Sequence, residues 1–231
     1  MNNIKNITHI GIVLLFLGGI ITYVAGYNKN NEASAELGKQ TGSEQVQALT
    51  AQKNPLSLPP KESQVTKWKE MKLTAERLVK ESNGNFKKSW ALYLVREAKR
   101  HNIDPFIVYE LLKVETGGTF NPKLVGPQTE YGRAYGMAQF MKNTAPWIAD
   151  MAGLPYKEEL LFDPYYSMQL SMTYLNFLHD QYGNWNEALT AYHRGMGGLK
   201  NYKQENGHAR SWYAVEIQDK AELHPSFASA K

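Results

Sequence analysis

One segment fixes its own structure more tightly than any other part of the chain, the run from Asp104 to Gly118. Asp104 followed by Pro105 marks a helix start, because aspartate accepts a hydrogen bond from the first turn and proline suits the first helical position. Gly117 and Gly118 mark the end, since glycine tolerates the left-handed backbone of a C-terminal cap. The sequence therefore predicts a short apolar helix that ends at Glu115.

The position of Glu115 makes it a candidate general acid. It follows Leu111 by four residues and Leu112 by three, so helical geometry puts it on or beside the apolar face. Burial disfavours the charged form of a carboxylate and raises its pKa, which a general acid near neutral pH requires. The helix alone leaves an alternative open, a glutamate that turns into solvent just past the core.

Apolar residues recur at helical spacing after Lys61, where the folded part is expected to begin. The first helix places Val65 and Trp68 on its apolar face and ends before the Asn83-Gly84-Asn85 break. No stretch shows sustained two-residue alternation of β-branched residues, so the prediction is a mainly α domain with loops between helices. The other expected helices cover approximately 89–100, 144–152, 166–182, 185–192 and 212–221.

An uncharged apolar run from Ile10 to Tyr27 has roughly the length needed to cross a bilayer. Lys5 precedes the run, which favours an orientation with the N-terminus inside. We expect residues 1–27 to be a transmembrane anchor. A cleaved signal peptide, after which the protein would be secreted, is the alternative, and a buried core helix is disfavoured because the run has no amphipathic side.

Residues 28–60 are rich in Asn, Gln, Ala, Ser, Lys and Glu and poor in large apolar residues. Such a stretch cannot bury enough surface to offset its ordering entropy, so we expect a flexible linker. The linker would carry a folded domain, residues 61–231, away from the membrane.

Composition excludes several classes of function. The chain has no cysteine, which rules out disulfides and thiolate chemistry. Its net charge of +4 suits an anionic partner, but no basic stripe interleaved with aromatics and no zinc-finger spacing points to nucleic acid. Nothing resembles a nucleotide loop, and His101, His179, His193 and His208 show no ligand spacing with carboxylates. We expect neither a metal nor a cofactor.

Four short motifs follow the Glu115 segment in a fixed order: Gly136-Met137-Ala138-Gln139, Thr144-Ala145, Asp163-Pro164 and Ala191-Tyr192. Each is weak alone. Together they resemble the lytic transglycosylases of the soluble-lytic-transglycosylase (SLT) type, relatives of goose-type lysozyme, over about residues 91–217. The resemblance implies a lysozyme-like helical fold and an enzyme that acts on the glycan strands of peptidoglycan.

By this resemblance, Glu115 protonates the glycosidic oxygen between N-acetylmuramic acid and N-acetylglucosamine. It then takes the proton of the muramoyl C6 hydroxyl, which closes a 1,6-anhydro ring. One carboxylate suffices for this chemistry, although the sequence leaves open that folding brings Glu130 or Asp150 close. The alternatives are a lysozyme-like hydrolase with water as nucleophile and a non-catalytic protein that binds or scaffolds the cell wall.

The resemblance also implies roles for residues around Glu115. Gln139 matches a substrate-binding glutamine, with loop bracing as its alternative role. Tyr192 matches the tyrosine whose hydroxyl orients the catalytic glutamate, with core packing as its alternative. Gly136 is expected to allow the tight turn that places Gln139 in the groove. Met137 is expected either to line a sugar subsite or to pack in the core.

The chain departs from the family pattern at several positions. Thr116 stands where serine is usual, Gly126 where a sugar-contacting serine is frequent, and His193 where asparagine is usual. We interpret His193 as a replacement that keeps one hydrogen bond rather than as a second titrating group. Aromatic side chains suit a sugar groove, and the candidates are Tyr131, Tyr135, Trp147, Tyr165 and Tyr166.

The expected partners are therefore peptidoglycan glycan strands and, through the N-terminal helix, the membrane. We expect a single-pass protein of the bacterial cell membrane with its catalytic domain on the extracytoplasmic side. An anchor and a linker of this length are also compatible with association with a wall-spanning membrane machine.

Overall fold

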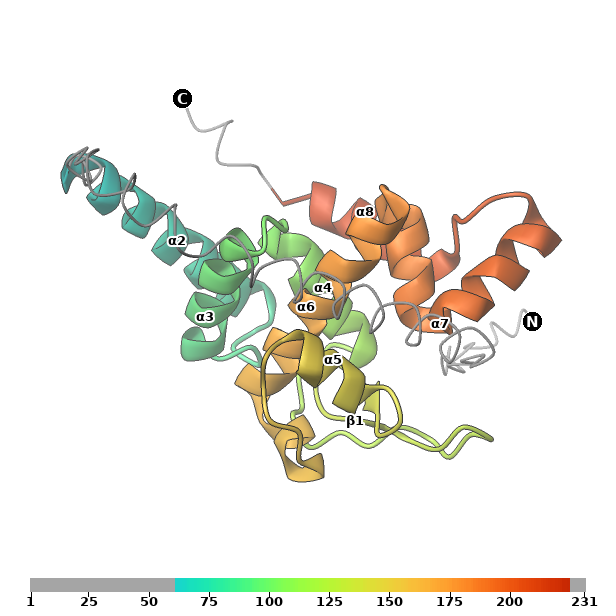
Figure 1. Cartoon of the computed structure of the whole chain (residues 1–231). Helices are drawn as coiled ribbons and strands as arrows, with labels where there is room; N and C mark the ends of the chain where they lie inside the picture. Colours follow the sequence, from blue (N-terminus) through green and yellow to red (C-terminus); the bar gives the residue numbers. More distant parts are fainter. Residues whose placement is uncertain (1–60, 225–231) are drawn as a thin grey trace, which may run out of the picture.

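The computed structural model describes residues 61–224 (Figure 1). The predicted anchor, residues 1–27, and the predicted linker, residues 28–60, lie outside this range. Within residues 61–224, no helix combines the length and the apolar character that a membrane span needs. The anchor therefore stays a prediction.

The described part of the chain is mainly α-helical, as the sequence predicts. Its two strands, β1 (Ala134–Tyr135) and β2 (Phe140–Met141), form one small antiparallel hairpin in which Ala134 faces Met141. The helices are α2 (Lys61–Glu81), α3 (Lys88–Arg100), α4 (Pro105–Glu115), α5 (Ala145–Met151), the 3-10 helix η1 (Glu158–Phe162), α6 (Pro164–Tyr182), α7 (Trp185–Asn206) and α8 (Trp212–Glu222).

Helix starts were the most accurate local predictions. The Asp104 side chain accepts a hydrogen bond from the backbone N–H of Phe106 at 2.9 Å, and Asp163 does the same for Tyr166 at 2.9 Å. The helix predicted over 185–192 is present as the first part of α7, and it ends close to the predicted position. Gly195, at φ 72° and ψ 163°, is non-helical and kinks the chain there, and a second helical part that the sequence analysis did not predict runs on to Asn206.

Helix α6 lies at the centre of the domain, where it packs against α3, α5, α7 and η1 (Figure 1). It is apolar on more than one side, and Met168, Leu170, Met172, Leu175 and Leu178 are all fully buried. Helix α4 packs against α3 and α8. These contacts bring the end of α4 next to the start of α8.

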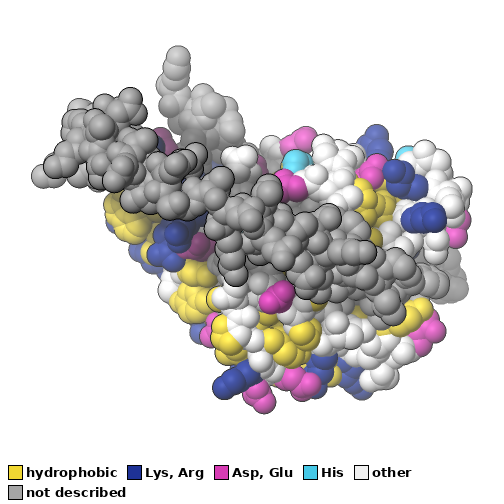
Figure 2. All heavy atoms as spheres, viewed as in Figure 1, with side chains coloured by type: hydrophobic (Ala, Val, Ile, Leu, Met, Phe, Trp, Pro, Cys, Tyr) yellow, Lys and Arg dark blue, Asp and Glu magenta, His cyan; other side chains and the backbone are white. Residues whose placement is uncertain are grey.

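The first turns of α2 extend beyond α3, the helix that covers the later turns of α2 (Figure 1). Val65 and Trp68 are 62% and 56% exposed, so the prediction that they belong to a buried face was wrong. The buried face begins near Thr74, because α3, with 13 residues, is too short to cover all 21 residues of α2. Figure 2 shows hydrophobic side chains beside Lys and Arg side chains on this part of the surface.

A buried histidine links α2, α4 and the end of α8. The Nδ1 atom of His224 lies 3.0 Å from Oε2 of Glu81, and its Nε2 atom lies 3.0 Å from Oε1 of Glu110. Lys113 donates to the same oxygen of Glu110 at 3.1 Å, and Phe106 stacks on the imidazole at 4.2 Å. Burial raises the pKa of Glu110, but the hydrogen bonds from His224 and Lys113 outweigh it, so the pKa lies below its ordinary value.

Replacing this histidine, His224→Ala, should lower the free energy of unfolding by about 3 kcal/mol at neutral pH, because it leaves a buried carboxylate with Lys113 alone. The folded-state pKa of Glu110 is depressed, so the stability it contributes is present above its unfolded pKa and is lost as the pH falls through the folded value. The difference between the two proteins should therefore shrink in acid.

Urea denaturation at several pH values measures this effect. The neighbouring Leu223 is 82% exposed, so Leu223→Ala should change the free energy of unfolding by no more than about 0.5 kcal/mol. Equal losses for the two variants would contradict a stabilising role for the histidine.

Candidate active site

The centre of the site is a hydrogen bond between two helices. Glu115, the last residue of α4, is partly buried, and its Oε1 atom accepts a hydrogen bond of 2.6 Å from the hydroxyl of Tyr213. Tyr213 lies in the first turn of α8, where Ser211 caps the helix by accepting from the backbone N–H of Ala214. The cap fixes the direction in which Tyr213 leaves the helix, and so positions its hydroxyl on the carboxylate.

Sequence reasoning missed Tyr213. It is separated from Glu115 by 98 positions, and none of the family motifs recognised in the sequence includes it. The one available signal was an aromatic residue in the first turn of an expected helix, two positions after a serine that could cap it. That signal indicates a helix start and says nothing of a long-range partner.

The environment of Glu115 favours its neutral form. Burial raises the pKa of Glu115 to about 7, and the hydrogen bond from Tyr213 partly offsets this rise. The carboxyl group can therefore both give and accept a proton near neutral pH. The raised pKa that the helical spacing of α4 predicts is thus present in the structure.

The turn after Glu115 is held by the hydroxyl of Thr116. This hydroxyl donates to the carbonyl of Leu112 at 2.7 Å and accepts from the backbone N–H of Phe120 at 3.0 Å. The two glycines that follow have φ values of 58° and 79°, a left-handed backbone that glycine adopts without strain. Threonine in place of the usual serine keeps the hydroxyl that ties the end of α4 to the loop.

Tyr192 lies near Glu115 but does not donate to it. Its hydroxyl donates to the carbonyl of Ala138 at 3.1 Å. Burial raises the pKa of Tyr192 well above its ordinary value, and the charge of Glu115 adds to this rise. The hydroxyl bond that the family resemblance assigns to Tyr192 is therefore made by Tyr213 in this structure, while Tyr192 ties α7 to the β1–β2 turn.

That turn depends on a glycine. Gly136 has a φ of 76°, and a Cβ atom added there would lie 1.8 Å from the carbonyl oxygen of Leu161. The tight turn expected at Gly136 is therefore present, and a larger residue would clash with η1. Beyond the turn, Met137 is completely buried in the core, so its side chain packs and does not line a sugar subsite.

The amide of Gln139 braces the same turn. Its nitrogen donates to the carbonyl of Gly136 at 2.7 Å and to that of Leu124 at 3.5 Å. Its oxygen lies 2.9 Å from the position that a Cβ atom of Gly126 would occupy, so glycine at 126 makes room for it. The structure thus shows the bracing role of Gln139, and because the side chain is partly exposed, substrate binding stays a prediction.

His193 is buried and supports its neighbours through its ring. It stacks on Tyr213 with ring centroids 4.6 Å apart and planes 10° apart. Burial lowers the pKa of His193 to about 4, with a further contribution from the charge of Arg194. The imidazole is therefore neutral at pH 7. Its Nδ1 atom has no hydrogen-bond partner among the described residues, and the ring packs by stacking on Tyr213.

The other aromatic candidates are mostly engaged in packing. Trp147 packs edge-on against Tyr174 and Phe177, and Tyr135 packs edge-on against Phe162. The hydroxyl of Tyr166 donates to Pro155. Tyr165 packs edge-on against Tyr93, and Tyr131 lies in the loop before β1. None of these contacts joins a candidate to Glu115.

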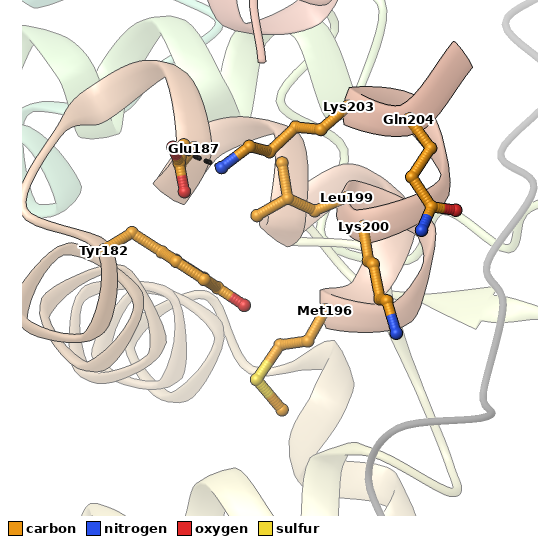
Figure 3. Close-up of a pocket in the computed structure, with 7 residues that line it drawn as sticks. All are labelled: Tyr182, Glu187, Met196, Leu199, Lys200, Lys203 and Gln204. Atoms are coloured by element: carbon orange, nitrogen blue, oxygen red, sulfur yellow. Dashed lines mark hydrogen bonds and ion pairs between the residues drawn. The ribbon is translucent and has the colours of Figure 1, made fainter. Parts of the chain in front are cut away.

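A separate pocket of about 340 Å³ lies between the end of α6 and the second half of α7 (Figure 3). Lys203 donates to Glu187 across it at 2.8 Å. The pocket is lined by Tyr182, Glu187, Met196, Leu199, Lys200, Lys203 and Gln204, so no residue that the sequence assigns to the active site contributes to it.

One group of described side chains has the composition of a metal site, namely Glu81, Glu110 and His224. Both ring nitrogens of His224 already face a carboxylate oxygen, and Lys113 shares the oxygen of Glu110. Both carboxylates are thus already engaged by side chains. No spacing in the sequence indicates this group, because its members come from three distant helical segments.

The helical fold around Glu115 is lysozyme-like. The lytic transglycosylase Slt of Pseudomonas aeruginosa, solved as an inactive Glu-to-Gln mutant, superposes with a TM-score of 0.50 and 22% sequence identity, over 61% of this chain and 24% of the other. The 70 kDa soluble lytic transglycosylase of Escherichia coli gives a TM-score of 0.43 and 21% identity, over 56% of this chain and 21% of the other. The chain therefore spans about a quarter of the length of these structures.

The family is shown by sequence. The transglycosylase SLT domain model matches residues 93–215, more than half of the chain, so this protein belongs to the transglycosylase SLT domain family. The search of curated protein sequences gave no match. The matched range lies within the 91–217 interval that the ordered motifs indicated.

Replacing the hydroxyl donor to the acid, Tyr213→Phe, should raise the pKa of Glu115 by about one unit, because the lost hydrogen bond favours the charged carboxylate. Carbon-13 NMR titration of labelled glutamate carboxyl groups measures this pKa without any assay of activity. Tyr192→Phe is the matched control and should leave the value near that of the parent, since its hydroxyl donates to Ala138. A larger rise of the Glu115 pKa in Tyr192→Phe than in Tyr213→Phe would show that Tyr192 is the orienting tyrosine.

Proposed function

We propose that this protein is a peptidoglycan lytic transglycosylase that cleaves the β-1,4 bond between N-acetylmuramic acid and N-acetylglucosamine and leaves 1,6-anhydro ends. The observation that carries the proposal is the pKa of Glu115, raised to about 7 on a side chain still partly exposed. Membership of the SLT domain family supports the same substrate class.

The reaction needs two proton transfers through one group. The neutral carboxyl group of Glu115 gives its proton to the glycosidic oxygen as the bond to C1 breaks. The resulting carboxylate then accepts the proton of the muramoyl C6 hydroxyl, whose oxygen forms the new bond to C1. No water is consumed, and the carboxyl group returns to its neutral form. A pKa near the working pH suits a group that acts in both directions.

The surroundings of Glu115 favour one carboxylate over a pair. Glycosidases that hydrolyse usually place two carboxyl groups on either side of the bond. Among the described residues, burial and the Tyr213 hydroxyl are the influences on the pKa of Glu115, and no second carboxylate contributes. Glu130 is instead next to Tyr131, whose pKa it raises, and Asp150 is exposed on α5.

Mass spectrometry of digested peptidoglycan tests the proposal. The full chain should release fragments with anhydromuramoyl ends, and Glu115→Gln should slow their release by about 10²- to 10⁴-fold, the contribution typical of general acid–base catalysis. Glu130→Gln and Asp150→Asn, matched changes of the two other candidate acids, should leave the rate and the products unchanged.

Fragments with mainly reducing ends would overturn the assignment as a transglycosylase and favour a lysozyme-like hydrolase. Activity that survives in Glu115→Gln, or none in the parent, would favour a protein that only binds the wall.

The apolar run of residues 10–27 supports a further proposal, that the protein is anchored in the bacterial cell membrane with the catalytic domain on the extracytoplasmic side. The polar stretch of residues 28–60 would let the domain reach the glycan strands. This arrangement suits local opening of the wall beside a membrane machine.

The absence of cysteine allows a direct test of this topology. A single cysteine introduced by Ser43→Cys should react in intact cells with a maleimide that does not cross the inner membrane, whereas Asn3→Cys should react only after lysis. The protein should also stay in the membrane fraction after carbonate extraction. A mature protein that lacks residues 1–27 by intact mass would instead establish a cleaved signal peptide.

A further inference from the structure

An exposed tryptophan lies directly beside the acid's hydrogen-bond partner. Trp212 is the first residue of α8 and is 49% exposed, while Tyr213, the next residue, is buried and donates to Glu115. The centroids of the two aromatic rings are 5.7 Å apart. The indole is thus separated from the catalytic carboxyl group by one tyrosine side chain.

The indole of Trp212 packs against two aromatic rings and is half exposed. His193 and Tyr213 stack on each other with planes 10° apart, and Trp212 lies beside this stack, 5.5 Å from the first ring and 5.7 Å from the second. Its plane is inclined at 76° and 82° to theirs. The indole is thus held against the stack while about half of its surface remains in water.

The backbone that carries the indole is held firmly. The hydroxyl of Thr190 on α7 donates to the carbonyl of Ala209 at 2.7 Å and lies 2.7 Å from the hydroxyl of Ser211. All three residues are buried, and Ser211 also caps α8. A side chain on such a segment loses little further freedom when a ligand binds, which preserves affinity.

We propose that Trp212 is a stacking platform for an N-acetylhexosamine ring of the glycan strand, in the sugar-binding position next to the bond that Glu115 cleaves. This rests on the proposed function. The C–H face of a pyranose ring is apolar, and a flat, half-exposed aromatic side chain offers it a large contact area at low entropic cost. His193 is the positioning residue, because its ring supports both the platform and Tyr213.

Other exposed aromatic side chains among the described residues lack this connection. Trp68 is on the part of α2 that extends beyond α3, outside the range matched by the family model. Tyr165 packs edge-on against Tyr93, on the first turn of α6. Neither contacts Glu115, Tyr213 or His193. Trp68 therefore provides a control that matches Trp212 in residue type and in exposure.

Binding is best measured in the full chain carrying Glu115→Gln, which holds substrate without cutting it. Co-sedimentation with purified peptidoglycan sacculi gives the affinity. Adding Trp212→Ala should weaken binding by about tenfold, the ratio that corresponds to ~1.4 kcal/mol of lost stacking. Trp212→Phe should recover much of the affinity, and Trp68→Ala should bind like the parent. In chains with Glu115 intact, Trp212→Ala should raise KM more than it lowers kcat.

The support that His193 gives to Trp212 can be measured by tryptophan fluorescence. Soluble N-acetylglucosamine oligomers should change the tryptophan fluorescence of the parent, and Trp212→Phe should remove that change. His193→Ala should weaken both the fluorescence change and the binding, and His193→Phe, which keeps a flat ring, should restore them in part. A His193→Ala protein with unchanged fluorescence response would exclude the positioning role.

The outcomes separate the two proposals. If the parent binds and cuts glycan while Trp212→Ala behaves like Trp68→Ala in affinity and KM, Trp212 is not a stacking platform. The proposal that the protein is a lytic transglycosylase is then unaffected. If the parent neither binds nor cuts, both fail. Circular dichroism and thermal melting of each variant ensure that a loss of binding is not a loss of fold, and Trp212→Phe tests the platform if the alanine variant unfolds.

Discussion

The site depends on the hydrogen bond from Tyr213 to Glu115, because it joins the helix that carries the acid to the helix that tunes it. Burial raises the pKa of the Glu115 carboxyl group, and the hydrogen bond from the neutral Tyr213 hydroxyl lowers it in part. The resulting pKa is about 7. A charged partner at the same distance would lower the pKa much further and leave the group ionised at neutral pH. The remaining fold holds two helix ends, from α4 and α8, in contact.

Much of this domain follows from local chemistry. The segment from Asp104 to Gly118 contains its own start signal, apolar stripe and stop signal, so its helix and the place of Glu115 on it could be predicted from the sequence. The tight turn at Gly136 could also be predicted from the sequence, since the turn requires a left-handed backbone. The family was recognisable because several weak motifs occur in a fixed order.

The features that sequence reasoning missed depend on contacts between distant segments. In the sequence, Tyr213 is an aromatic residue at the start of a helix like many others. Only the packing of α8 on α4 brings its hydroxyl to Glu115. Trp68 fits a buried stripe by spacing, but the length of α3 leaves it in water. Periodicity identifies which side of a helix is apolar, but it cannot determine how far a neighbouring helix extends or which of two tyrosines reaches a carboxylate.

The contacts of His224 have a consequence for the limits of the folding unit. Glu81 and His224 both lie outside the range matched by the SLT domain model, residues 93–215. His224 contacts Glu110, in the helix that ends at Glu115, and Glu81 contacts the other ring nitrogen of His224. A fragment trimmed to the matched range would leave this buried carboxylate with a single lysine neighbour. A piece of this protein that keeps these contacts therefore extends past the family boundary on both sides, and residues outside the matched range contact the helix that ends at Glu115.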